Sequence, residues 1–314
     1  MNRLDFSMST FVAVALLTAT SAHAANVFSA SGSCGKGVGG LLDNDPSLDV
    51  SCPGGTWVDP STGTASSASW TASGGNGRFR AGATVAASTL PPLGRSTPLA
   101  LGVSVSAVAS QRDDLLFNVP GLAGTPAKMA LSLWIHGEMD AANVSPAGNT
   151  ASRADWIFRA STVSNRRSLG SAAAGSGVTN FYDWGFTGDP HVAALYGFEL
   201  PVVLGQIVTL DLSLEAKPSA SGWRAGLPGS ALYLTPVQST AVASFGNTAL
   251  WQGITSLTLN DGTPVQNWTL SSSSGFDYTS PVPESGTWAL MAGGLALLTA
   301  LSRRTRSATP RTAT

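Results

Sequence analysis

Charge is scarce in this chain of 314 residues. Charged residues make up 11% of the sequence, against roughly 25% in an average globular protein. Lysine is the rarer cation, and the lysines are Lys36, Lys128 and Lys217. Four arginines and no acidic residue stand between 303 and 314, so the chain before them is mildly acidic. No basic face of the kind that binds nucleic acid is therefore expected.

Histidine is scarce as well, and only His136 and His191 lie beyond the first 24 residues. Either could serve a Ser-His-Asp triad, but no Gly-x-Ser-x-Gly elbow accompanies them. His136 follows Trp134 on the polar side of a predicted strand, and the TGDPHV stretch around His191 predicts a loop. We expect no catalytic residue, and the protein is predicted not to be an enzyme.

The N-terminus, MNRLDFSMSTFVAVALLTATSAHAAN, has the order of a secretory signal peptide. Arg3 stands near its start, an apolar stretch runs from 11 to 20, and Ala22-His23-Ala24 is a small-x-small cleavage sequence. Residues 1–24 are therefore predicted to be removed during export, with Ala22 and Ala24 in the cleavage signal. The alternative is a buried N-terminal helix, which the cleavage pattern disfavours.

The C-terminus contains a second apolar stretch, within VPESGTWALMAGGLALLTALSRR. A helix over residues 287–302 would be about 24 Å long, which is short but workable for a hydrocarbon core of about 30 Å. Trp288 suits one interface, and the two arginines that follow suit the cytoplasmic side. We expect a transmembrane helix at 287–302 and a basic cytoplasmic tail at 303–314. This orientation places the body outside the cell, in agreement with the signal peptide.

The same residues resemble a PEP-CTERM sorting signal, in which a Pro-Glu-Pro motif precedes a membrane helix and a basic end. The residues that carry the resemblance are Val282, Pro283, Glu284, Trp288, Arg303 and Arg304. It implies recognition by an exosortase, a membrane-embedded cysteine protease, with cleavage near the motif. It also implies an exported protein of a Gram-negative bacterium that passes the secretion machinery and is held transiently in the membrane. Its destination would be the cell surface or an extracellular matrix.

Ser285 stands where the family has its second proline, which leaves the efficiency of cleavage open. A permanent anchor that is never cut is the alternative to processing. The linker with the sorting motif is predicted at 279–286. The stretch from Ser244 to Tyr278, SFGNTALWQGI…DGTPV…SSSSGFDY, also resembles the ends of other PEP-CTERM bodies, which implies a β-rich exported domain.

Two cysteines, Cys34 and Cys52, lie in the turn-rich contexts SGSCGKG and DVSCPGG. A metal site would need more ligands than this pair offers, and a reactive thiol is the other alternative. Because export implies an oxidising compartment, the even count predicts a disulfide. Closing a loop of this length would stabilise the fold by about 3 kcal/mol in the entropic description.

Several stretches of the body alternate apolar and polar residues with the period of a β-strand. They are LALGVSVSAVA, DDLLFNV, KMALSLWIHG and GQIVTLDLSLEAK. Asp261-Gly262 lies between two apolar runs and predicts a hairpin. One polar face per strand indicates antiparallel sheets on a shared core, and no internal stretch has a helical period. We expect an all-β body at 25–278, an antiparallel β-sandwich of jelly-roll-like type, either undivided or split near residue 95.

Acidic residues supply two further hypotheses. LLDNDPSLDV contains Asp43, Asp45 and Asp49, whose oxygens are suitable ligands for Ca²⁺, although their spacing is not that of an EF-hand. Turn chemistry explains these residues equally well. Calcium is thus a possible cofactor, and no other cofactor is expected.

Paired carboxylates could hydrolyse a polysaccharide if they flanked one glycosidic bond. The nominal pairs are Glu138 with Asp140, and Glu199 with Asp211. Their sequence positions do not predict the separation that the chemistry requires, and solubility at strand edges and turns explains them as well.

Tryptophan is plentiful, and eight of the nine lie in the body: Trp57, Trp70, Trp134, Trp156, Trp184, Trp223, Trp251 and Trp268. Such rings either fill a core or offer platforms for sugars. Trp134 is the best exposed candidate, since its strand buries the other face. We therefore expect a non-catalytic structural or glycan-binding protein, with exopolysaccharide as a possible partner. The alternatives are a secreted polysaccharide hydrolase and an ice-binding protein, although the regular threonine array of the latter is not found.

Overall fold

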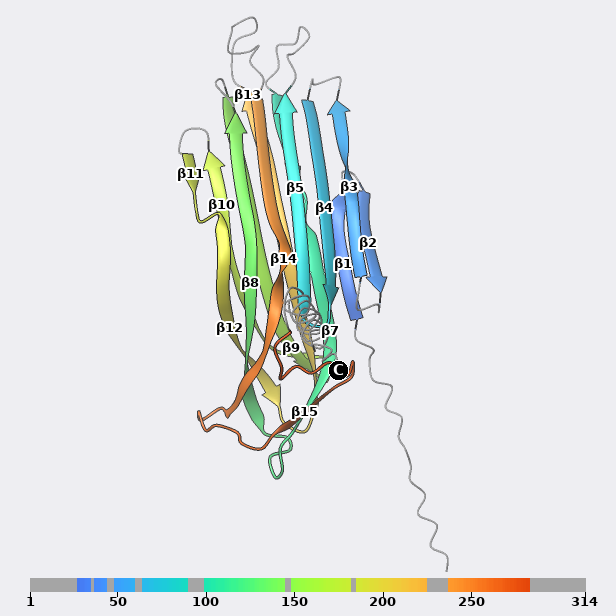
Figure 1. Cartoon of the computed structure of the whole chain (residues 1–314), viewed down its shortest axis with the longest axis vertical. Coiled ribbons are helices and arrows are strands. Elements are labelled where there is room, and N and C mark those ends of the chain that lie inside the picture. Colours follow the sequence, from blue (N-terminus) through green and yellow to red (C-terminus); the bar gives the residue numbers. More distant parts are fainter. Residues whose placement is uncertain are drawn as a thin grey trace, which may run out of the picture.

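The computed structural model describes residues 27–34, 37–43, 48–59, 64–89, 99–144, 148–181, 185–224 and 237–282 (Figure 1). Within these ranges the protein is all-β, its paired strands are antiparallel, and no helix occurs. No helix able to cross a bilayer was found in this part of the chain. The predicted signal peptide at 1–24, membrane helix at 287–302 and basic tail at 303–314 lie outside the described residues.

The larger sheet, here called sheet A, has nine strands. Seven of them follow the order β11-β10-β9-β13-β7-β1-β2, while β6 pairs with β13 and β15 pairs with β7. The strands are β1 (Val27–Cys34), β2 (Gly37–Asp43), β6 (Leu99–Ser104), β7 (Ala107–Asn118), β9 (Gly148–Ser164), β10 (Arg167–Phe181), β11 (Gly185–Thr187), β13 (Ile207–Arg224) and β15 (Thr269–Ser272).

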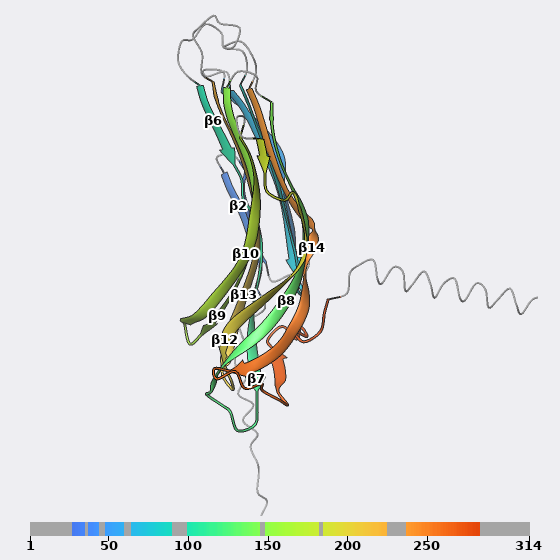
Figure 2. The same cartoon turned by 90° about the vertical axis from the view of Figure 1, so that its left-hand side faces the viewer.

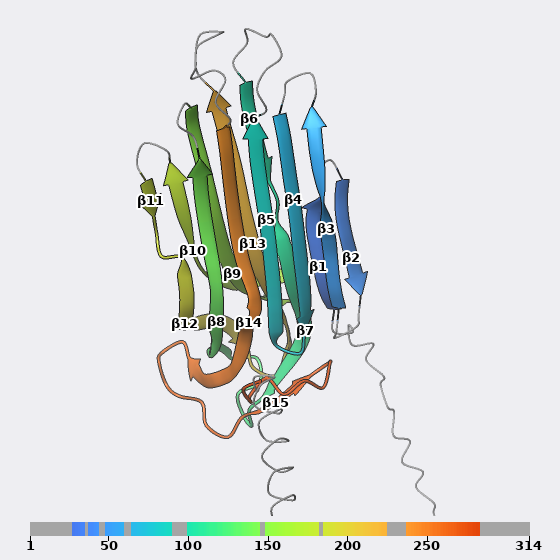
Figure 3. The ribbon, with the colours of Figure 1, turned by 45° about the horizontal axis from the view of Figure 1, so that its top comes forward.

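The smaller sheet, sheet B, has six strands in the order β12-β8-β14-β5-β4-β3. They are β3 (Leu48–Asp59), β4 (Thr64–Gly75), β5 (Arg78–Thr89), β8 (Pro126–Val144), β12 (His191–Val203) and β14 (Val237–Leu259). The two sheets run as two layers along the long axis of the body (Figures 2 and 3). Strands from both sides of residue 95 share these sheets, since β1 pairs with β7 and β5 pairs with β14.

The core lies between the sheets, and the predicted alternation identifies it correctly. Met129, Leu131, Leu133 and Ile135 of β8 are fully buried. The apolar positions of the predicted strands in β7 and β13 are buried in the same way: Leu115, Phe117, Val208, Leu210, Leu212 and Leu214. Because successive side chains of a strand point to opposite faces, the residues between them form the two outer faces of the body.

One predicted strand is divided in the structure. The stretch beginning at Leu99 forms β6, is interrupted at residues 105 and 106, and continues as β7. Both strands pair with β13, and the interruption lies opposite Pro218. Proline has no N–H to donate to a ladder, although its carbonyl accepts a hydrogen bond from the Val105 N–H at 3.2 Å.

The predicted hairpin at Asp261-Gly262 forms its turn but not a full second strand. The Asp261 carboxylate accepts a hydrogen bond from the Thr263 N–H at 2.9 Å, and Gly262 takes a φ of +88°, which glycine adopts without strain. The returning arm makes only a single bridge, between Thr258 and Pro264. The chain then leaves sheet B and forms β15 in sheet A.

Candidate functional site

A charged stripe covers the outer face of sheet A. Its members project from the central strands β7, β9 and β13 and carry four positive and four negative charges: Arg112, Asp114, Arg153, Asp155, Arg159, Asp211, Glu215 and Lys217. The register brings opposite charges together, since Asp211 lies opposite Arg112 and Lys217 lies opposite Asp155. In a chain with so little charge, this stripe gathers eight charged side chains on one face of sheet A.

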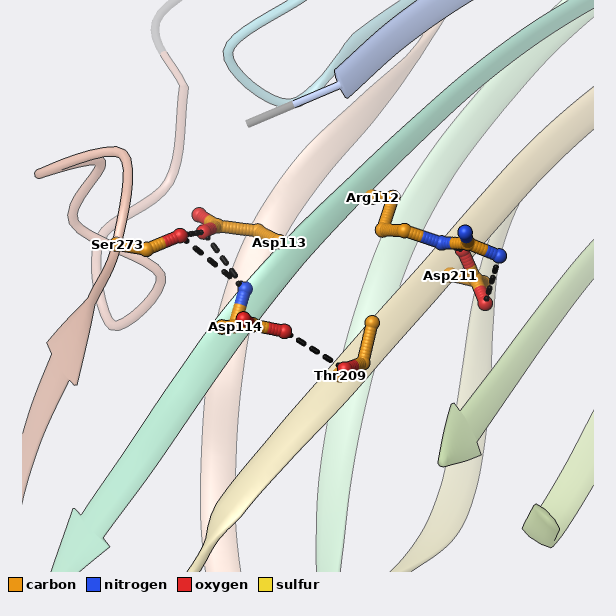
Figure 4. A network of polar contacts seen from close by, with 6 residues as sticks. All are labelled: Arg112, Asp113, Asp114, Thr209, Asp211 and Ser273. Carbon is orange, nitrogen blue, oxygen red and sulfur yellow. Dashed lines mark hydrogen bonds and ion pairs between the residues drawn. The ribbon is translucent and has the colours of Figure 1, made fainter. Parts of the chain in front are cut away.

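Three of the four acids of the stripe are paired with arginines. The Arg112 guanidinium donates to both Asp211 oxygens, at 2.5 and 3.1 Å (Figure 4). This hydrogen bond raises the pKa of Arg112. Arg153 bonds Asp155 at 2.6 Å, and a similar pair elsewhere joins Arg159 to Glu215 at 2.7 Å. Such exposed pairs stabilise a fold by only about 0–1 kcal/mol each, so they organise the surface more than they hold the fold.

Part of the stripe borders an open groove of about 540 Å³ between β10, β9 and β13. Small residues of β10, including Gly175 and Gly177, form one side, and Glu215 lies on the other. Burial raises the pKa of Glu215, but hydrogen bonds from Arg159 and Ser106 outweigh it, so the net pKa is lowered. A carboxylate that stays ionised is unsuited to act as a general acid. The groove is better suited to hydrogen bonding a polar ligand than to protonating a leaving group.

The carboxylate pairs named from the sequence are arranged differently from what hydrolysis requires. Glu199 projects from β12 on the outer face of sheet B, whereas Asp211 projects from β13 on the outer face of sheet A. These two acids cannot flank one glycosidic bond, because both sheets separate them. Glu138 and Asp140 do share the outer face of β8, but both are exposed, and a general acid needs burial to raise its pKa.

The outer face of sheet B carries a different feature, which we call the Trp134 row. It is formed by register neighbours on four strands: Leu195, Trp134, Leu250 and Arg78. Trp134 is half-buried and Leu195 is 60% exposed. Leu250 occupies an outward position but is only 4% exposed, so side chains on the outer face must cover it.

The surface beside the Trp134 row is open. Gly197 lies on β12 opposite Ser132, diagonal to Trp134. A Cβ added at Gly197 would meet no atom within 4 Å. His136, half-buried, occupies the next outward position of β8. Trp134 is thus flanked by polar groups on its own strand and, diagonally, by the open space above Gly197 of β12.

The other tryptophans whose side chains are described behave mainly as core residues. Trp70, Trp156 and Trp251 are at most 3% exposed. Trp268 is half-buried, and its ring centre lies 6.1 Å from that of Phe117. Trp134 is therefore the tryptophan best placed for contact with a ligand among those described, as its strand pattern predicts. The side chains of Trp57, Trp184 and Trp223 lie outside the described set.

A buried polar network joins strand β7 to the C-terminal segment at residues 273–278. Gln111 and Asp113 lie on the inner face of β7, and each is only 1% exposed. The Asp113 carboxylate accepts a hydrogen bond from the Ser273 hydroxyl at 2.5 Å (Figure 4) and another from the Ser274 N–H at 3.2 Å. It also accepts one from the Ser274 hydroxyl. A buried acid is tolerated here because its oxygens are satisfied.

Gln111 extends the network to Tyr278. Its side-chain amide donates to the Tyr278 hydroxyl at 2.7 Å and accepts from the Gly77 N–H at 3.0 Å. Burial raises the pKa of Tyr278, and the negative charge of Asp113 raises it further. The Tyr278 carbonyl in turn accepts from the Trp251 indole N–H at 2.9 Å. These contacts attach residues 273–278 to the core at both ends.

The network was not predicted from the sequence, although a signal for it exists. Gln111 and Asp113 have the same strand phase as Leu115 and Phe117, so their alternation places two polar residues inside. Polar residues at inward positions require partners. The sequence alone does not reveal that their partners are two serines and a tyrosine some 160 residues later in the chain.

Most of the predicted site residues lie beyond what the structure describes. Of the sorting motif only Val282 is described, and its N–H bonds the Trp251 carbonyl at 2.9 Å. His191 was predicted to lie in a loop, but it is the first residue of β12. It pairs with Glu138 of β8, and the pairing of the two strands continues from there. The predicted residues outside the described set are Ala22, Ala24, Asp45, Pro283, Glu284, Trp288, Arg303 and Arg304.

The cysteines and two of the calcium candidates are placed only by their backbone. Cys34 ends β1 in sheet A and Cys52 lies in β3 of sheet B, while Asp43 ends β2 and Asp49 lies in β3. Their side chains lie outside the described set, so the disulfide and the calcium site stay predictions. Among the described residues, no group of three His, Cys, Asp or Glu side chains is arranged to hold a metal.

Comparison with known proteins identifies no relative. No protein-family model, curated protein or solved structure matches this chain.

Proposed function

We propose that this is an exported, non-catalytic protein of the bacterial surface or matrix that binds exopolysaccharide through the Trp134 row. The proposal includes the finer fold assignment, a jelly-roll-like β-sandwich between an N-terminal signal helix and a C-terminal transmembrane helix. The repeated passage of the chain between the two sheets supports a sandwich of this type. Membrane insertion by residues 287–302 is transient, and an exosortase releases the body to the surface.

The observation that carries the proposal is the position of Trp134. The residue is partly exposed on a broad antiparallel face, with the exposed Leu195 on one side and polar neighbours along its strand. A flat indole on an open face suits stacking on a sugar ring, while flanking polar groups suit its hydroxyls. An open face also suits a long polymer, because the chain of sugars can continue past the contact in both directions.

The structure of the C-terminal segment suits delivery by the sorting tail. Val282, the first residue of the motif, is hydrogen bonded to the core, and Pro283 follows directly. Cleavage after this point would leave the Asp113 network intact. The released body would therefore keep its fold, which a surface protein requires after it loses its anchor.

Retention by exopolysaccharide tests the binding function. The full chain in detergent is passed through gels containing exopolysaccharide from the producing bacterium, and mobility is compared with that in plain gels. Trp134→Ala should weaken binding about tenfold, which corresponds to about 1.4 kcal/mol. Thr84→Ala, an exposed position on the same outer face, should bind as the parent does. Equal retention of Trp134→Ala and the parent would refute the proposed site.

Sorting is tested separately by mass spectrometry of the mature protein from its host. The expected product lacks residues 1–24 and ends near Pro283 and Glu284. An intact Arg311 on the surface-exposed protein would show that the tail is not processed. The predicted Cys34–Cys52 disulfide is tested in the same sample by alkylation without reduction, which should label neither thiol, and calcium by calorimetry.

A further inference from the structure

Strand β12 forms one edge of sheet B. It runs from His191 to Val203 and, among the described residues, pairs only with β8. Figure 2 views the body from the side on which this strand lies. A long edge presents free N–H and C=O groups, and proteins cover such an edge or use it to pair with another strand. Leu195, at 60% exposure, lies in the middle of this edge.

Prolines mark both ends of the free stretch. The Pro190 carbonyl accepts a hydrogen bond from the Met139 N–H at 2.8 Å, on the side of β12 that already pairs with β8. The Pro201 carbonyl accepts one from the Thr162 hydroxyl at 2.7 Å. Neither proline has an N–H to offer a new neighbour. The stretch available for pairing is therefore 191–200.

This stretch is complementary to itself when it runs antiparallel about Leu195. On the outer face, His191 of one copy would lie opposite Glu199 of the other, and Ala193 opposite Gly197. The inner face pairs only apolar and aromatic residues: Val192 with Phe198, and Ala194 with Tyr196. Because the arrangement is symmetric, each pair forms twice, and Leu195 meets Leu195 on the axis.

Other registers of the two β12 strands do not place complementary residues opposite each other. Shifting the strands by one position would place outward residues opposite inward ones, which the pleat forbids. Moving the axis to Ala194 pairs His191 with Gly197, and moving it to Tyr196 pairs Glu199 with Ala193. Only the axis at Leu195 places the His191 imidazole opposite the Glu199 carboxylate at both ends, where a ring N–H can donate to a carboxylate oxygen. Both groups are accessible, since the side chains of His191 and Glu199 are 74% and 71% exposed.

We propose that two copies of this chain form a symmetric dimer through β12, with the two-fold axis at Leu195 and sheet B continuing from one copy into the other. The Trp134 row of one copy then meets that of the second copy through the two leucines. The dimer thus carries two tryptophans on one continuous face. Its formation does not depend on whether that face binds a glycan.

Crosslinking at the axis tests the geometry. Directly opposite Cβ atoms in an antiparallel pair lie about 5 Å apart, so Leu195→Cys should join two copies through a short bis-maleimide, which forms a thioether with each thiol. The full chain is used in detergent, and the unmodified parent supplies the background from its own cysteines. Thr84→Cys, exposed on the same outer face, is the matched control. Crosslinked dimer from Leu195→Cys no greater than from Thr84→Cys would overturn the proposal.

Sedimentation of the same preparations tests the association itself. The parent should be a dimer, and Leu195→Glu should be a monomer with an unchanged circular dichroism spectrum, because two carboxylates would meet on the axis. Glu199→Ala should weaken dimerisation several-fold, whereas Glu138→Ala should not. Glu138 also lies near His191, at 4.0 Å, but it projects from β8, away from the axis. A monomeric parent, or a Leu195→Glu variant that dimerises as the parent does, would overturn the proposal.

Discussion

Two strands of the core, β7 and β8, solve the same packing problem with different residues. The inner face of β8 is continuously apolar, from Met129 to Ile135. The inner face of β7 is apolar at Leu115 and Phe117 but polar at Gln111 and Asp113, although these are buried as completely. The difference lies in what covers each strand. β8 faces the other sheet, whereas the polar part of β7 faces the returning C-terminal segment, which supplies serines and a tyrosine.

The polar residues of β7 have a different role from the apolar residues of β8. Apolar burial is not directional, so it cannot by itself fix where an irregular segment lies. Hydrogen bonds to a buried carboxylate are directional and costly to leave unmade. The network on β7 therefore specifies the path of residues 273–282, while β8 supplies bulk stability.

Asp113→Ala should have the largest effect. The Ser273 hydroxyl and the N–H and hydroxyl of Ser274 would lose their buried acceptor, at roughly 1–3 kcal/mol for each unsatisfied group. We expect the free energy of unfolding to fall by about 3–5 kcal/mol, measured by urea denaturation. Protease sites in residues 273–282 should also become accessible. The control is Asp114→Ala, which removes one half-buried hydrogen bond to Thr209 and should cost about 1 kcal/mol. Equal effects of the two substitutions would contradict the role of the network.

Leu133→Ala should destabilise by about 3 kcal/mol, because it leaves a cavity in a fully packed face. In contrast to Asp113→Ala, it should not expose the C-terminal segment selectively. Hydrogen exchange separates the two effects: protection of residues 273–282 should fall only as far as global stability does. Ser132→Ala, on the outer face of the same strand, should stay within about 0.5 kcal/mol of the parent. Selective opening of the segment by Leu133→Ala would show that both strands hold it.

Tyr278→Phe should cost about 1–2 kcal/mol, because the Gln111 amide loses its buried acceptor. It should also change the alkaline limb of the stability profile. The pKa of Tyr278 is raised in the fold by burial and by Asp113, so the folded state keeps its proton while the unfolded chain loses it above about pH 10. Stability from this group is complete below that pH and is lost as pH rises further. Unfolding measured from pH 9 to 11 should show a shallower loss in Tyr278→Phe. Identical slopes would refute the buried position of the hydroxyl.

Arg112→Ala should have the smallest effect. It removes an exposed ion pair with Asp211 on the outer face of β7, for which about 0–1 kcal/mol is expected. The loss should shrink further in high salt, since exposed charges are screened. A loss as large as that of Asp113→Ala would mean that the charged stripe, and not only the inner network, holds the fold.

Much of the architecture could be predicted from local pattern. The alternation of apolar positions such as Leu210 and Leu212 identified buried strand faces, and Asp261-Gly262 identified a turn, because both signals depend on neighbours in sequence. The division of β6 from β7 was missed, since it depends on Pro218 in a strand more than 100 residues away. Trp134 also differs from the buried Trp156 and Trp251 in its position on an outer strand face, which the number of tryptophans does not predict.

The pattern of residues was enough to predict the buried strand faces and an antiparallel β-body, and the residues at the two ends predict export and sorting. These properties follow from period, composition and local motif. The folded arrangement was needed to show that Gln111 and Asp113 are satisfied by Tyr278 and the two serines. It was also needed to place Glu199 and Asp211 on the outer faces of different sheets. It also placed Leu195 beside Trp134 on an open edge. Such placements depend on pairings between strands that are distant in sequence. The residues of one strand predict which of its faces is buried, but they do not specify which strand pairs with it.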